Sequence, residues 1–126
     1  MELNKEAQFV SQILQMTQTR ELRWERTDAP QALWIGTDSR IFDFFAAPLS
    51  DKVLGIYEIR DRFYDGDRDQ HFWSSSITLG LFDKRMNHEY TFRVASAVMD
   101  LFNEVKRQVA NVDDFFDSVL TAKKPS

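Results

Sequence analysis

The sequence predicts a single α+β domain, in which an antiparallel meander sheet of about five strands lies between an N-terminal helix and C-terminal helices. Apolar residues recur with helical spacing near both ends of the chain and alternate with period two through its middle. The connections between the alternating runs are short enough for sequential hairpins. At 126 residues the chain suits one core over residues 1–122, followed by a polar tail at residues 123–126.

The first helix is predicted from an apolar stripe that steps by three and four residues. Its members are Leu3, Ala7, Val10, Leu14 and Thr17, widened by Phe9, Ile13 and Met16. Alternation then begins at Leu22 and predicts a strand over residues 22–27, with Leu22 and Trp24 pointing inward.

The next two strands are predicted as a hairpin, in which residues 32–37 and 40–46 flank a loop at Asp38-Ser39. This register gives one purely apolar face, the expected core, made of Leu33, Ile35, Phe42 and Phe44. The opposite face is mixed and carries Trp34, Ile41, Asp43 and Phe45. Asp-Ser is a weak turn signal, and a slip of one residue would exchange the two faces. Either a helix covers the mixed face or it binds a partner.

Pro48 predicts the end of that strand, because proline cannot donate to a ladder. Two further strands are predicted over residues 53–63 and 73–82. Asn87 predicts the start of a second long helix, whose apolar stripe is Tyr90, Val94, Ala97, Val98, Leu101 and Val105. A short helix then restarts at Asn111 and carries Phe115, Phe116, Val119 and Leu120.

Cysteine is absent, which excludes a disulfide scaffold, a cysteine-ligated zinc site and a thiol nucleophile. The charged start of the chain does not match a secretory signal, and no apolar run approaches the ~18 residues of a membrane-spanning helix. We therefore expect a cytoplasmic protein without a membrane partner. The net charge of −4, with basic residues interleaved among acids as in Arg60-Asp61-Arg62, argues against a nucleic-acid partner.

The segment Asp65–His71 resembles a metal site, since carboxylates stand at alternate positions. A calcium loop of the EF-hand type also needs Gly at its sixth position and Glu at its twelfth. Counted from Asp65, those positions hold Gln70 and Ser76, so a solvated hairpin loop is the expected structure and no metal or cofactor is predicted. A small enzyme or metal-binding protein that uses these carboxylates is the alternative.

We expect the protein not to be an enzyme. Its two histidines, His71 and His88, have no partner in sequence, and the serines at residues 74–76 lack the elbow motif of a catalytic serine. An enzyme that uses carboxylates brought together by folding is the alternative.

The order of these features resembles a group of small uncharacterised bacterial and phage-associated proteins. The resemblance rests on Met16-Thr17 leading to Leu22-Arg23-Trp24-Glu25, and on residues 101–107 and 112–120. It covers nearly the whole chain but departs from the group at Arg20-Glu21, where small residues are expected. It implies an N-terminal helix, a Leu-x-Trp strand, an antiparallel sheet and a C-terminal helix, and it implies no activity.

The chain is also similar to bacterial secretion chaperones, which are small, acidic, cytosolic α+β dimers. Those proteins carry a helix inside the sheet, for which residues 47–52 are too few. We therefore expect a cytosolic protein-interaction module, an adaptor or regulatory partner, with a chaperone-like homodimer as the alternative. Its partner, another protein or a second copy, should contact the mixed face, because aromatic anchors beside a polar group are typical of binding hot spots.

Overall fold

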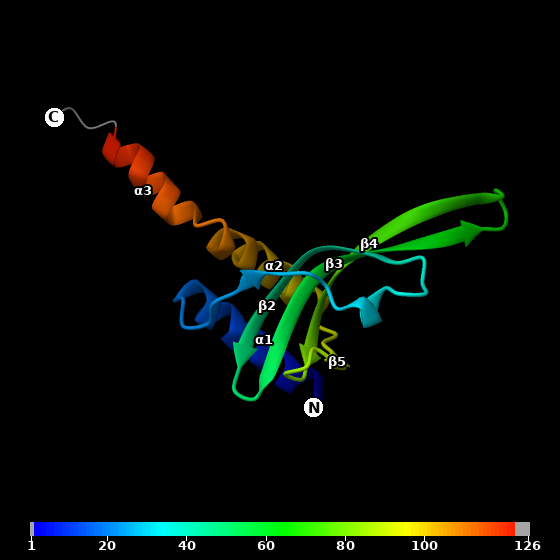
Figure 1. Cartoon of the computed structure of the whole chain (residues 1–126), viewed down its shortest axis with the longest axis horizontal. Coiled ribbons are helices and arrows are strands. Elements are labelled where there is room, and N and C mark those ends of the chain that lie inside the picture. Colours follow the sequence, from blue (N-terminus) through cyan, green and yellow to red (C-terminus); the bar gives the residue numbers. More distant parts are fainter. Residues whose placement is uncertain (1, 123–126) are drawn as a thin grey trace.

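A five-stranded antiparallel sheet packs against two long helices in the computed structural model, which describes residues 2–122 and, for side chains, residues 5–121 (Figure 1). The elements are α1 (Glu2–Gln18), β1 (Glu25–Arg26), the 3-10 helix η1 (Gln31–Leu33), β2 (Arg40–Leu49), β3 (Lys52–Asp65), β4 (Gln70–Phe82), β5 (His88–Thr91), α2 (Ala95–Val109) and α3 (Val112–Ala122). The strand order is β1-β2-β3-β4-β5, which confirms the predicted α+β class and antiparallel meander. The side chain predicted for Leu3 and the predicted tail at residues 123–126 lie outside the described residues.

The main core lies between one face of the sheet and the pair α1 and α2. Both helices contribute the apolar stripes expected from their spacing, and β2, β3 and β4 contribute the residues that point to that face. The buried members are Val10, Ile13, Leu22, Trp24, Phe45, Ala47, Leu54, Ile56, Leu79, Val98, Leu101, Phe102 and Val105. The inward positions predicted for Leu22 and Trp24 are confirmed, although only Glu25 and Arg26 beyond them pair as a strand.

An extra residue in β2 decides which of its side chains enter this core. Phe42 pairs with Glu58 and Phe45 with Ile56, so two residues of β2, Asp43 and Phe44, oppose one residue of β3. Asp43 adopts a φ of 51°, a left-handed conformation that Asp tolerates better than most residues. The bulge turns Phe45 toward the helices and leaves Phe44 on the opposite face, which reverses the faces predicted for these two residues.

The predicted hairpin between residues 32–37 and 40–46 is wrong. Residues 31–37 instead form η1 and a turn, closed by bonds from the Ile35 N–H to the Gln31 carbonyl (2.7 Å) and from the Thr37 N–H to the Trp34 carbonyl (3.1 Å). Ile35, expected in the core, is 59% exposed. β2 finds its partners in β1 and β3 instead, because β3 alone offers it eight paired residues, more ladder than a hairpin through the weak Asp-Ser turn would give.

Two predicted element boundaries are also wrong. β2 continues through Pro48 to Leu49, since β1 pairs only with Phe45 and Ala46 and the proline lies where that side of β2 has no pairing strand among the described residues. The second long helix begins at Ala95 and not at Asn87, because the Asp83 carboxylate accepts the Asn87 N–H (2.9 Å) and forms a turn into β5. The bonds from Asn87 lower the pKa of Asp83.

A second cluster, Phe44, Tyr57 and Phe82, lies on the sheet face away from the helices. The Phe44 ring stacks on Tyr57 with a centroid separation of 5.3 Å and meets Phe82 edge-on at 5.9 Å. Burial raises the pKa of Tyr57 to about 12. Phe44 and Phe82 lie over Gly55, which pairs with Gly80 across the β3–β4 ladder, so the absence of side chains at these glycines leaves room for the two rings.

Gly55→Ala should destabilise the fold by about 1–3 kcal/mol, the usual cost of overpacking. A Cβ at Gly55 would lie 2.7 Å from Cε1 of Phe82 and 2.8 Å from Cζ of Phe44. Gly66→Ala is the matched control, because its nearest contact would be an ordinary 3.7 Å. Denaturant unfolding of both variants measures the difference, and equal stabilities would contradict the close packing over Gly55.

Gln108, near the end of α2, joins three segments through one amide. Its Oε1 accepts the Trp24 N–H (2.8 Å), and its Nε2 donates to the carbonyls of Thr17 (2.9 Å) and Leu22 (2.8 Å). The Trp24 indole N–H donates to the Thr17 hydroxyl (3.0 Å), which donates to the Ile13 carbonyl (2.8 Å). The end of α1, the following turn and α2 are therefore held together through the Gln108 amide, although the Thr17 carbonyl also accepts the Arg20 N–H (3.2 Å).

Gln108→Ala should lower the free energy of unfolding by about 2 kcal/mol, because it leaves the Trp24 N–H and the Leu22 carbonyl without these partners in a half-buried site. The Thr17 carbonyl keeps its bond from the Arg20 N–H. Asn103→Ala, on the exposed side of the same helix, controls for the loss of an amide. The measurement is urea unfolding followed by circular dichroism. A loss below about 0.5 kcal/mol, the range of ordinary surface substitutions, would show that Gln108 does not tie these segments together.

Candidate protein-binding surfaces

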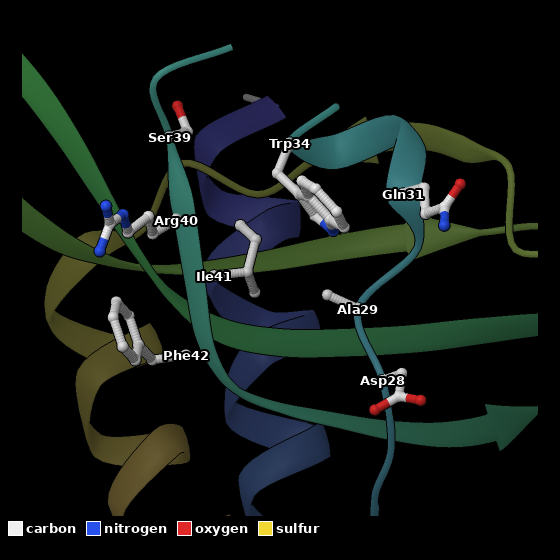
Figure 2. A pocket seen from close by; sticks show the side chains of 8 residues that line it. All are labelled: Asp28, Ala29, Gln31, Trp34, Ser39, Arg40, Ile41 and Phe42. Atoms are coloured by element: carbon white, nitrogen blue, oxygen red, sulfur yellow. The ribbon is translucent and has the colours of Figure 1, made fainter. Parts of the chain in front are cut away.

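The residues predicted to bind a partner do not share a face. Trp34 and Ile41 line a hollow of about 580 Å³ between η1 and β2. Figure 2 shows their side chains turned toward each other beside Ala29, while Arg40 and Phe42 project from the other side of the strand. Phe45 is fully buried beneath the helices. The expectation that Phe45 lies with Trp34 on one open face is therefore wrong, and the bulge at Asp43 is the reason.

Asp43 is held by an ion pair across the edge of the sheet. Its Oδ1 accepts a bond from Nη1 of Arg26 at 2.6 Å, and the Arg26 guanidinium also lies 4.8 Å from the centroid of the Phe45 ring. The carboxylate thus stabilises the bulge from outside, close to the wall of the hollow. What remains of the predicted surface is the open pair Trp34 and Ile41, of which Trp34 is 38% exposed.

Replacing Phe45 and Trp34 separately by Ser should give unequal results. Phe45→Ser removes a ring that packs edge-on against Phe102, with centroids 6.1 Å apart, and should cost about 3 kcal/mol or more. Trp34→Ser should cost about 1 kcal/mol, because the side chain is already partly solvated. Thermal and urea unfolding distinguish them, and a costlier Trp34 variant would contradict this description of the two positions.

The carboxylates of the Asp65–His71 segment are used to close the turn between β3 and β4. The Asp65 Oδ1 accepts the Asp67 N–H (3.1 Å), and the Asp69 carboxylate accepts the Tyr64 hydroxyl, a bond that raises the pKa of Tyr64. Over residues 2–122 the structure brings together no group of three or more acidic or histidine side chains that could hold a metal ion.

Two further acidic side chains, both on β3, also have partners. Glu58 bonds Nε of Arg60 at 2.8 Å, and Asp61 accepts the Ser39 hydroxyl. His88 bonds the Thr91 hydroxyl at 2.8 Å within the β5 segment, while His71 packs beside Tyr64 with ring centroids 5.1 Å apart. These arrangements stabilise turns and strand edges, and they do not assemble a base beside a nucleophile in a cleft.

The sheet extends beyond the helices as a two-stranded arm formed by the distal halves of β3 and β4 (Figure 1). Thirteen residue pairs run without a bulge from Val53–Phe82 to Asp65–Gln70. Large side chains stay exposed along the arm: Phe63 and Phe72, whose rings stack at 5.7 Å, with Tyr64 and Trp73. The sequence predicted strands over residues 53–63 and 73–82, but not that aromatic residues gather on the arm.

The helix α3 points away from the body at the other end of the molecule (Figure 1). Its large apolar side chains are not covered by any described part of the chain: Phe115 is 62% exposed, Phe116 51%, Val119 37% and Leu120 64%. The helix is tied to α2 by an ion pair between Nη2 of Arg107 and Asp113 (2.7 Å), which raises the pKa of Arg107. The sequence indicated these residues as a helical apolar face, and their exposure emerged only from the packing.

Comparisons with protein-family models, curated proteins and solved structures found no match for this chain. The two resemblances drawn from the sequence therefore stay predictions. In the described residues no helix is both long and apolar enough to cross a membrane.

Proposed function

We propose that this chain is a cytosolic protein-interaction module that acts by binding and not by catalysis, with α3 as its principal binding element. The observation that carries the proposal is the row of four apolar side chains on α3, each between 37% and 64% exposed. Amphipathic helices with one apolar face bind by laying that face into a groove of a partner.

The size of the exposed face supports this role. Taking about 150–250 Å² for each large side chain, the four residues leave roughly 400 Å² of apolar surface open to water. That value is typical of the largest patch on a monomer, and such patches often serve an interaction. The Trp34–Ile41 hollow is a second surface, and it is less open because Ile41 is partly buried against the Phe44 cluster.

A small enzyme or a metal-binding protein is the less supported alternative. The carboxylates nearest His71 serve the β3–β4 turn through bonds to Tyr64 and the Asp67 N–H. Binding through α3 needs no such assembly, and it accounts for an exposed apolar face that would otherwise favour aggregation.

The double variant Phe116→Ser with Leu120→Ser should abolish binding while leaving the fold intact. Each substitution removes an exposed side chain, so the free energy of unfolding should change by less than about 1 kcal/mol for each. Met99→Ser is the matched control, because Met99 is a 47% exposed apolar residue on α2. The measurements are urea unfolding, and affinity capture with oligomeric mass for the parent and both variants.

A loss of about 3 kcal/mol or more per substitution would identify α3 as part of the core and remove the proposed surface. If the double variant still binds its partner, α3 is not the binding surface and the proposal fails. If Met99→Ser also loses binding, the loss in the double variant reflects a general decrease in surface hydrophobicity and not a specific contact of α3.

A further inference from the structure

The sheet face that α1 and α2 cover continues along the arm with a different chemistry. Ile56 of β3 lies in the helix-covered core, and every second residue after it points the same way. This set includes Arg60, Arg62 and Tyr64, and the ladder places Trp73 opposite Arg62. On the neighbouring strand β2, Arg40 pairs with Arg60 and Phe42 pairs with Glu58.

These side chains contact one another across the strands. The Arg40 guanidinium lies 5.2 Å from the centroid of the Trp73 ring, and that of Arg60 lies 4.1 Å from the Phe42 ring. We call this set the Arg–aromatic face: Arg40, Phe42, Arg60, Arg62, Tyr64 and Trp73. Its three arginines outnumber the two acidic side chains in contact with it, Glu58 beside Arg60 and Asp69 at the Tyr64 hydroxyl, so the face keeps a positive charge. All six members are exposed.

The opposite side of the arm is acidic. Asp61 pairs with Ser74, and Asp65 pairs with Gln70, so both carboxylates point away from the Arg–aromatic face. Charges that are interleaved in the sequence, as in Arg60-Asp61-Arg62, are thus sorted by the strand onto two sides. A partner that binds the Arg–aromatic face should present apolar and acidic side chains.

The helix α3 has that composition. It carries Asp113, Asp114 and Asp117 beside its exposed apolar residues and has no Lys or Arg between residues 112 and 122. Asp117 is exposed, and the described chain shows no ion pair for it or for Arg62. The two surfaces complement each other in charge, and both present large apolar side chains.

We infer that the Arg–aromatic face of one copy of this chain binds α3 of a second copy, and that α3 of the first copy binds the same face of the second. We call this reciprocal contact the exchange. The inference rests on the proposed function and names the partner for it. Figure 1 shows α3 and the arm at opposite ends of the molecule, so one copy cannot bring its own pair together. Two copies lying side by side in opposite directions, related by a two-fold axis, place each α3 over the arm of the other.

The dimensions fit. An 11-residue helix is about 16 Å long, and the six arm residues from Arg60 to Asp65 span about 20 Å. One α3 and one receiving face would each bury roughly 400 Å², giving about 800 Å² per copy, the size of a standard stable interface. A single one-way contact would bury only half of that area.

Pairing of α3 with α3 is disfavoured by charge. It would bring together the two copies of Asp117, which makes no ion pair in the described chain, while Asp113 and Asp114 are already paired with Arg107 and Arg20 of their own chain. It would also bury only about 800 Å² in total, below the range of stable interfaces. The exchange avoids both the repulsion and the small buried area, because Arg62 of each copy meets Asp117 of the other and two contacts form.

Charge reversal across the interface tests the exchange. In sedimentation equilibrium at low salt the parent should be a dimer, and Arg62→Glu and Asp117→Lys should each weaken dimerisation at least tenfold. An equimolar mixture of these two variants should regain a dimer, because the heterodimer matches Lys with Glu at one contact and Asp with Arg at the other. Added salt should weaken the parent dimer.

The controls separate this inference from the proposed function. Asp100→Lys, which reverses an exposed charge on α2, should dimerise like the parent, and circular dichroism with melting temperatures checks that every variant folds. A monomeric parent that still binds another protein through Phe116 and Leu120 would overturn the exchange and leave the proposed function standing. If Arg62→Glu stays dimeric while the Phe116→Ser, Leu120→Ser variant does not, α3 meets another surface and the inference fails.

The Arg–aromatic face must also be tested for binding of a nucleic acid, since arginine and aromatic side chains also bind single strands. Titration with a fluorescent single-stranded oligonucleotide should give no binding. A monomeric parent that binds the oligonucleotide, with binding lost in Arg62→Glu, would overturn the exchange.

Discussion

The extra residue at Asp43 is the constraint on which the two faces of the sheet depend. Before it, β2 points Ile41 to the open side; after it, β2 points Phe45 and Ala47 to the helices. Without the bulge, the alternation begun by Ile41 would turn Phe45 outward and place Phe44 beneath α1 and α2. The Arg26–Asp43 ion pair holds this conformation at the edge where β1 ends its short pairing with β2.

The two clusters that result are stabilised in different ways. On the helix side, apolar stripes meet the sheet, and Gln108 supplies the polar groups that the turn after α1 needs. On the other side, Phe44 and Phe82 pack over Gly55 and Tyr57 joins their cluster, which is partly covered by Ala29, Leu33 and Met86. The body of the protein is therefore closed on one face by helices and on the other by its own aromatic side chains.

Both proposed binding elements extend beyond this body. The arm persists as a regular ladder because thirteen pairs run without interruption, although its distal half has no helix against it in the described chain. The helix α3 follows α2 after Asn111, whose φ of 57° ends α2 and changes the direction of the chain before α3. Each element leaves large side chains in water, an arrangement that costs solubility unless a partner covers them.

The sequence alone determined the features that depend on local periodicity: the stripes of α1 and α2, the inward Trp24, the period-two runs of β3 and β4, and the apolar face of α3. The predictions from sequence were wrong for residues whose conformation depends on partners far away in the chain. Residues 32–37 alternate like a strand but find no ladder, and residues 88–91 continue a helical stripe but pair with β4 because Asp83 holds Asn87 in a turn. Only the tertiary structure decided that Phe45 is core, that the arginines of the arm share one side with Trp73, and that α3 stays uncovered. The physical reason is that a bulge, a strand register and a helix position are chosen by contacts between segments far apart in the chain, which local patterns do not encode.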